Sequence, residues 1–192
     1  MNYIRQIKDY VPTNEQEACD KSLILKFIER NRDTVLLREN EVAHITSSGF
    51  IMNRQLDSVL FLHHNIRNTW AWTGGHADGD GDLLAVALRE AHEETGLTGI
   101  EPQTNGIASL DVLVNFGHVR KSKYVSAHLH LSVAYILIAD SHEKPIINPE
   151  ENSDIRWFSV ESVNSELFLP NDIYLYHKII DRAKRMQCGE EI

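Results

Sequence analysis

The chain has 192 residues, 42% of them hydrophobic and 24% charged, with a formal net charge of −9 at pH 7. This length allows one domain plus an appendage, whereas the negative charge argues against general nucleic-acid binding, which needs a basic track. The two cysteines, Cys19 and Cys188, form no CxxC pair and indicate neither a disulfide framework nor a zinc site. The sequence shows no apolar leader and no apolar run of membrane-spanning length, so we expect a cytoplasmic protein without a membrane partner.

Residues 1–43 are predicted to form a helical appendage. Thr13 begins a pattern typical of a helix start, and a second short helix is expected around residues 35–37. The apolar stripe of the first helix must pack on the main domain or on another subunit, so a homodimer that meets through these helices is one expectation. The stripe comprises Leu23, Ile24, Phe27 and Ile28.

Residues 44–192 are predicted to form the main domain. Runs rich in β-branched and aromatic residues predict strands, and the run 129–139 is almost continuously apolar, as in a central strand buried on both faces. A closing helix is expected over 170–185. This order of elements favours an α/β sandwich around a mixed β-sheet. The predicted strands are 48–52, 59–62, 107–115, 129–139 and 155–160.

Three carboxylates share one side of a predicted helix within the run 75–97. Glu90, Glu93 and Glu94 stand at i, i+3 and i+4, a spacing that brings their side chains together. Like charges at this spacing destabilise a helix, and a cation held between them would relieve the repulsion; carboxylate oxygens suit Mg²⁺ or Mn²⁺. The alternative is a solvated acidic face on a surface helix.

The ends of this helix are also marked. We expect Asp80 or Asp82 to cap its start and Gly96 to end it in a left-handed conformation. An apolar stripe beside the carboxylates should pack on the core. It consists of Leu84, Ala87, Leu88, Ala91 and Thr95.

The run 75–97 resembles the Nudix box, G-x5-E-x7-R-E-U-x-E-E-x-G-U, in which U is a bulky aliphatic residue. The resemblance to Nudix hydrolases implies an α/β/α sandwich and cleavage of a nucleoside diphosphate linked to another moiety. It also implies a Mg²⁺ or Mn²⁺ ion held by Glu90, Glu93 and Glu94 with the carbonyl of Gly74, and a nucleotide-like small molecule as substrate. The matching residues are Gly75, Arg89, Glu90, Ala91, Glu93, Glu94, Gly96 and Leu97.

Two positions depart from the family pattern. Gly81 replaces the first glutamate of the box, which in the family helps to orient the helix through the box arginine, here Arg89. Asp82 lies about two helical turns before Arg89 and could substitute, whereas Asp80 is less well placed. Thr73 replaces the proline that usually precedes the paired glycines. Because the three metal-side glutamates remain, we interpret Gly81 as a structural variation; the alternative is a non-catalytic nucleotide-binding module.

Hydrolysis also requires a general base for the attacking water. Glu90 or Glu94 could serve within the box. Nudix hydrolases alternatively recruit a glutamate from a later loop, and the candidates here are Glu150 and Glu151, with Glu143 a weaker one. The alternative for Glu150 and Glu151 is a solvated acidic turn.

Three histidines are candidates for substrate contacts. His76 follows the paired glycines, and His128 and His130 stand at i, i+2 on a predicted strand, so they face the same way. They could contact the substrate phosphates or bind a metal as a pair. We prefer the alternative that they face solvent or hydrogen-bond within the sheet to metal ligation, and among functional roles we favour substrate contact.

Basic and aromatic residues supply further candidates. Arg120 and Lys123 belong to a basic island between two predicted strands, where a loop could grip phosphate; a solvated loop is the alternative. Trp72 could stack on a base, whereas Trp70 is at least as well explained as a core residue.

The leading hypothesis is therefore a metal-dependent hydrolase of substrates such as ADP-ribose, a nucleotide sugar or a nucleoside triphosphate. Isomerisation of isopentenyl diphosphate, which other Nudix folds perform, ranks below it, because Cys19 and Cys188 are poor candidates for the acid and base that this reaction needs.

Overall fold

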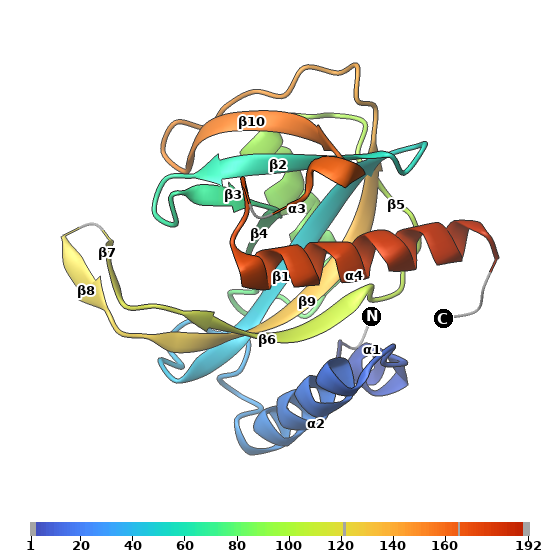
Figure 1. The fold of residues 1–192 in the computed structure, drawn as a ribbon. Helices are drawn as coiled ribbons and strands as arrows, with labels where there is room; N and C mark the ends of the chain where they lie inside the picture. The colour runs from blue at the N-terminus through green and yellow to red at the C-terminus, as the bar shows by residue number, and fades with distance from the viewer. Residues whose placement is uncertain (1–2, 121, 165, 190–192) are drawn as a thin grey trace.

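A mixed sheet of eight strands forms the centre of the molecule (Figure 1). The computed structural model describes residues 3–120, 122–164 and 166–189, but not the side chain of Arg120. The strand order is β10-β2-β1-β9-β5, with β3 on β2, β4 on β1 and β6 on β9. The strands are β1 (Ala43–Asn53), β2 (Ser58–His64), β3 (Thr69–Ala71), β4 (Thr73–His76), β5 (Glu101–Pro102), β6 (Ser109–Asn115), β9 (His128–Ala139) and β10 (Asn152–Ser159).

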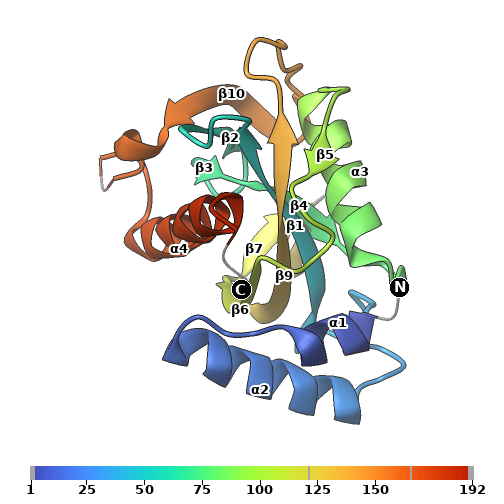
Figure 2. The same ribbon diagram turned by 90° about the vertical axis from the view of Figure 1, so that its right-hand side faces the viewer.

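Helices lie on both faces of this sheet, so the fold is the expected α/β/α sandwich (Figure 2). On one face, α3 (Leu83–Thr95) contributes Ala87 and Ala91 to a core that also contains Ile45. On the other face, α4 (Pro170–Gln187) contributes Ile179 to a second core. A 3-10 turn, Val160–Ser162, follows β10. No helix among the described residues is both long and apolar enough to cross a membrane.

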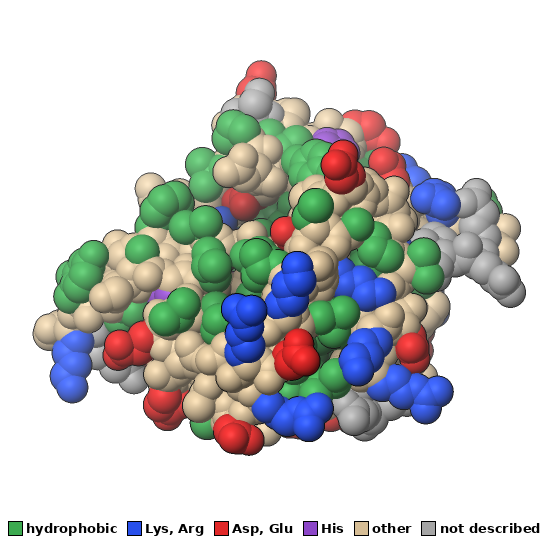
Figure 3. Space-filling view, turned by 90° about the horizontal axis from the view of Figure 1, so that it is seen from below, with side chains coloured by type: hydrophobic (Ala, Val, Ile, Leu, Met, Phe, Trp, Pro, Cys, Tyr) green, Lys and Arg blue, Asp and Glu red, His purple; other side chains and the backbone are tan. Residues whose placement is uncertain are grey.

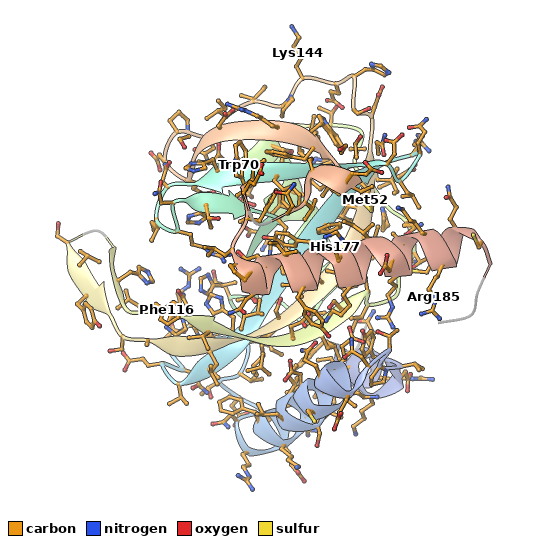
Figure 4. All side chains as sticks on the ribbon, viewed as in Figure 1. Met52, Trp70, Phe116, Lys144, His177 and Arg185 are labelled. Atoms are coloured by element: carbon orange, nitrogen blue, oxygen red, sulfur yellow. The ribbon has the colours of Figure 1, made fainter. Side chains whose placement is uncertain are left out.

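The predicted strands are all present, and β9 is central: it runs parallel to β1 and antiparallel to β5 and β6. The segment expected to be a loop between β6 and β9 instead contains a hairpin of β7 (His118–Arg120) and β8 (Lys123–Val125). The hairpin stands away from the main sheet in Figure 1, and Figure 4 shows Phe116 at its base.

Helix α3 has the predicted ends. The side chain of Asp82 accepts a hydrogen bond from the amide of Ala85, and Gly96 has a φ of 66°. The predicted apolar stripe was rotated relative to the observed one, because Leu83 and Val86 are buried while Leu84 and Leu88 are only partly buried. The shift turns Glu94 inward together with the stripe.

The predicted short helix at residues 35–37 is wrong. This segment forms turns, and the carbonyl of Val35 accepts a hydrogen bond of 2.7 Å from Ile45 on β1. The carbonyl of Val35, which a helix would use for its own hydrogen bond, is therefore bonded to the strand instead. The helical residues lie earlier, in α1 (Tyr3–Asp9) and α2 (Glu15–Arg30), and the side chain of Asn14 caps α2.

The helical appendage packs on the sheet of its own chain. Ile24 and Ile28 of α2 lie in the same core as the α3 side of the sheet, whereas Leu23 is exposed. The buried carboxylate of Glu17 pairs with Lys178 of α4 at 3.1 Å. Figure 3 looks onto the side of the molecule formed by α1 and α2, where basic, acidic and apolar side chains are interspersed.

Candidate active site

The paired glycines and the acidic helix meet through backbone and side-chain contacts. Glu94 is only 6% exposed, and its Oε2 atom accepts a hydrogen bond of 2.9 Å from the amide of Gly74. A Cβ atom at Gly75 would overlap the carboxyl group of Glu90. Glu93 is exposed beside them. Gly75 is therefore the residue that allows strand β4 to approach the carboxylates of α3.

The electrostatics of this cluster suit a cation. Burial, together with the charges of Glu151, Glu90 and Glu93, raises the pKa of Glu94 to about 8 against the opposing effect of the Gly74 amide. Burial, and to a smaller extent the negative charge of Glu93, also raises the pKa of Glu90. Two or more carboxylates that repel each other are stabilised when a divalent ion lies between them, and all the donors are hard oxygens. The donor set therefore fits Mg²⁺ or Mn²⁺.

The partner of Arg89 differs from the prediction. Arg89 lies 3.7 Å from Asp80 and 3.7 Å from Glu90, whereas Asp82 is engaged as the helix cap. Asp80 precedes the cap. Its Oδ1 atom accepts a hydrogen bond of 2.8 Å from the amide of Asp82, and its Oδ2 atom faces Arg89, so Asp80 takes the place that we expected for Asp82. A Cβ atom at Gly81 would make an ordinary contact of 3.5 Å with Tyr3 of α1.

Thr73, the other departure from the box pattern, is fully buried. Its hydroxyl donates a hydrogen bond of 2.8 Å to the carbonyl of Gly49 on β1. The bond fixes the start of β4, where proline could not have donated to the sheet.

Of the two later glutamates, Glu151 is tied electrostatically to the acidic cluster, because its charge raises the pKa of both Glu90 and Glu94. Glu150 is exposed, and its amide donates to the side chain of Asn148. Glu143, the weaker candidate, is engaged elsewhere, since its carboxylate accepts hydrogen bonds from Thr98.

The three candidate histidines lie together and are joined by His44, which the sequence analysis had not singled out as functional. The ring centroid of His44 lies 5.0 Å from that of His76, 4.9 Å from that of His128 and 5.2 Å from that of His130. The cause is strand register, because His44 pairs with His130 and Thr46 pairs with His76. The place of His44 in this cluster could be predicted only from the parallel pairing of β1 with β9, and no local sequence pattern indicates that pairing.

The other candidates for substrate contact are dispersed. Trp72 is half-buried and packs edge-on against Phe50 and beside Tyr176 in the second core. Lys123 is exposed on the β7–β8 hairpin, and Arg120, which pairs with it in register, has a side chain outside the described part of the structure. Trp70 is buried, as expected for a core residue.

The structure is thus an α/β/α sandwich that holds a glutamate-rich helix against a strand with paired glycines. A model of the NUDIX domain matches residues 42–179, and the chain belongs to the Nudix family.

Individual relatives are more distant. The chain is 30% identical to the isopentenyl-diphosphate Delta-isomerase of Aliivibrio fischeri over 83% of this chain and 79% of that protein. It is 23% identical to a probable DHNTP pyrophosphohydrolase of Lactococcus lactis over 73% of this chain and 80% of that protein. The crystal structure of a Nudix-family hydrolase from Clostridium perfringens aligns with a TM-score of 0.52 at 18% identity, covering 72% of this chain and 96% of that one. This last likeness shows the fold alone.

Proposed function

We propose that the chain is a divalent-metal-dependent hydrolase that cleaves the pyrophosphate bond of a nucleoside diphosphate linked to another moiety, or of a nucleoside triphosphate. The observation that carries the proposal is the carboxylate cluster of Glu90, Glu93, Glu94 and Glu151, in which burial and mutual repulsion raise the pKa of Glu94 to about 8. Family membership supports the same reaction class.

In this proposal Glu90, Glu93 and Glu94 hold Mg²⁺ or Mn²⁺ together with the carbonyl of Gly74. A bound ion would neutralise charge on the pyrophosphate oxygens and lower the pKa of a coordinated water. The amide of Gly74 keeps the carboxylate of Glu94 in place, and Arg89 lies beside Glu90.

Glu151 is the general base that we favour among the candidates. It acts on the acidic cluster through its charge, yet it is exposed and belongs to the turn before β10 rather than to α3. A carboxylate in that position could accept the proton of the attacking water. The oxygen of that water would bond to one phosphorus while the bond from that phosphorus to the bridging oxygen breaks. Each product would keep one of the two phosphoryl groups that the bridge had joined; a nucleoside triphosphate would leave its third phosphate on one of the two.

The substrate roles proposed for His76, His128, His130 and Trp72 draw on their positions around the strand that carries the paired glycines. Arg120 and Lys123 would reach the substrate from the β7–β8 hairpin. A nucleotide-like small molecule is the ligand class that this family supports.

The test is product formation from a panel of ADP-ribose, nucleotide sugars, dinucleoside polyphosphates, nucleoside triphosphates and isopentenyl diphosphate. Each compound is incubated with Mg²⁺, with Mn²⁺ and with a chelator. Cleavage of one class that requires metal and is lost in Glu93→Gln would support the hydrolase and identify the leaving group. Tight binding of a nucleotide without any product would favour the non-catalytic module instead.

One observation favours a second candidate. The relative that is 30% identical over most of both chains carries the name isopentenyl-diphosphate Delta-isomerase. Conversion of isopentenyl diphosphate to its double-bond isomer in the same panel, without release of phosphate, would support that activity and contradict the hydrolase.

A further inference from the structure

Four histidines from three strands converge on one face of the sheet. Side chains alternate along a strand, so His128 and His130 share a face, and their register partners place His44 and His76 on that face as well. Gly75, the neighbour of His76, instead faces Glu90 on α3. Strand β4 therefore separates the histidine cluster from the acidic cluster.

The ring nitrogens of this cluster lie close enough to share one ion. One nitrogen each of His44, His76 and His130 lies within 4.8 Å of the other two, and the Nε2 atoms of His128 and His130 are 3.1 Å apart. In a tetrahedral zinc site, with Zn–N bonds of about 2.0–2.1 Å, neighbouring ligand nitrogens are about 3.3 Å apart. Small rotations of the side chains would close the remaining gap.

The hydrogen bonds orient lone pairs toward the centre of the cluster. The Nδ1 atom of His44 lies 3.0 Å from the carbonyl of Asn40, and that of His128 lies 2.8 Å from the carbonyl of Ser126. A carbonyl only accepts, so both Nδ1 atoms carry the proton and both Nε2 atoms present a lone pair. A histidine that donates from one nitrogen to a carbonyl is the usual support for a metal bond at the other nitrogen.

One of these lone pairs is unsatisfied. His44 is 2% exposed, and its Nε2 atom has no hydrogen-bond partner within the described part of the chain. The amide nitrogen of Asn115 lies 3.2 Å from Nε2 of His128 and 3.3 Å from Nε2 of His130. An amide nitrogen only donates, so both Nε2 atoms carry a lone pair, and metal binding would replace these two hydrogen bonds with bonds to the ion. Nε2 of His44 is thus a buried acceptor without a donor, which is energetically costly, and a bound cation would satisfy it.

We propose that His44, His76 and His130, with His128 as a fourth ligand, form a transition-metal centre of their own, distinct from the carboxylate site on α3. Metal ligation would take the place of the direct substrate contacts considered for His76, His128 and His130. Imidazole nitrogens suit Zn²⁺, Fe²⁺, Co²⁺ or Ni²⁺, whereas Mg²⁺ requires hard oxygen ligands. The two clusters therefore differ in the class of ion that each selects.

The test uses the untagged protein, freed of metal with a chelator and titrated with Co²⁺ and then Zn²⁺. We expect one Co²⁺ per chain with the visible d–d absorption of a four-coordinate nitrogen site, displaced by Zn²⁺. His76→Gln and His130→Gln should weaken binding by more than about tenfold, and circular dichroism verifies that both remain folded. His76 is only partly buried, so its variant decides the question if His130→Gln does not fold.

Two variants serve as controls. His142→Gln changes an exposed histidine outside the cluster and should leave Co²⁺ binding unchanged. Glu93→Gln should also retain it, which separates this centre from the metal proposed for hydrolysis. Absence of tight Co²⁺ and Zn²⁺ binding in the folded wild-type protein, or binding that is unchanged in His76→Gln, would overturn the proposal and leave a histidine network that is only hydrogen-bonded.

Discussion

The carboxylate of Glu94 on α3 accepts a hydrogen bond of 2.9 Å from the backbone amide of Gly74 on β4. An ionised carboxylate accepts such a bond more strongly than a neutral one, so the amide opposes the burial that raises the pKa of Glu94. The contact fixes the position at which negative charge develops when this side chain ionises.

Glu94→Gln should abolish most turnover without unfolding the protein. The amide side chain has the same shape and can still accept the hydrogen bond from Gly74, but it brings no charge to a cation. We expect the turnover number to fall by about 100-fold or more, measured on the substrate that the panel identifies. Glu161→Gln, at an exposed position in the 3-10 turn, is the control. Equal activity in both variants would contradict a metal role for Glu94.

Stability of the metal-free protein should fall as the pH rises. The pKa of Glu94 is raised from 4.5 to about 8 in the folded state, so between these values the native chain binds more protons than the unfolded chain. The free energy of unfolding is therefore highest below pH 4.5 as far as this group is concerned, and it declines up to about pH 8. Melting temperatures in a chelator at about pH 5 and about pH 9 test this.

The same measurement has two controls. Glu94→Gln should lose most of this pH dependence, because the variant has no proton to release. Added Mg²⁺ should raise the melting temperature more at the higher pH, where the carboxylate is ionised. A wild-type melting temperature that does not change with pH would mean that Glu94 is not desolvated.

Gly75→Ala should impair activity through the position of Glu90. The added methyl group would overlap the carboxyl carbon of Glu90, so the side chain must move or β4 must shift away from α3. We expect a loss of activity of about tenfold or more and weaker activation by Mg²⁺. Gly99→Ala, whose Cβ would approach its nearest neighbour, Glu143, at 3.7 Å, should behave like the wild type. Full activity of Gly75→Ala would show that Glu90 does not need this approach.

Glu151→Gln and Glu150→Gln form a matched pair that tests the general base. If Glu151 accepts the proton of the attacking water, its variant should lose about 10²- to 10⁴-fold in kcat with little change in KM. Glu150→Gln, one residue earlier, should remain close to the wild type. A larger effect at Glu150, or no effect at either position, would return the role to the box glutamates.

Lys178→Ala should destabilise the fold strongly. Lys178 pairs with Glu17 at 3.1 Å and with Asp111 at 2.6 Å, and its side chain is 8% exposed. Removing the cation leaves Asp111 without this ion pair and Glu17 with the more distant Arg182, at 4.0 Å, at a cost of about 3–5 kcal/mol. Urea unfolding measures the effect, with Lys184→Ala at an exposed position of the same helix as control. A change below about 1 kcal/mol would mean that water reaches the cluster.

Local chemistry made much of the fold predictable. The caps of α3 at Asp82 and Gly96 follow from residue preferences at helix ends, and the apolar run of β9 gave a central strand. The side-by-side placement of Glu90 and Glu94 follows from the helical repeat alone. These features depend on residues within a few positions of each other.

The features that were missed depend on contacts between distant segments. The turn at residues 35–37 is set by a hydrogen bond to β1, and the pairing of Arg89 with Asp80 is set by which aspartate caps the helix. The place of His44 among the other histidines required the register of two parallel strands. Three-residue strands such as β7 and β8 are too short to show a periodic pattern.

The ion pairs of Lys178 also bear on how the chain reaches its native state. Glu17 and Lys178 come from opposite ends of the described chain, so during synthesis the carboxylate emerges from the ribosome long before its cation. Until α4 is made, burial of Glu17 would leave a negative charge without its partner. Docking of the appendage onto the sheet before α4 is made would therefore carry this cost, so we expect it to follow the synthesis of α4.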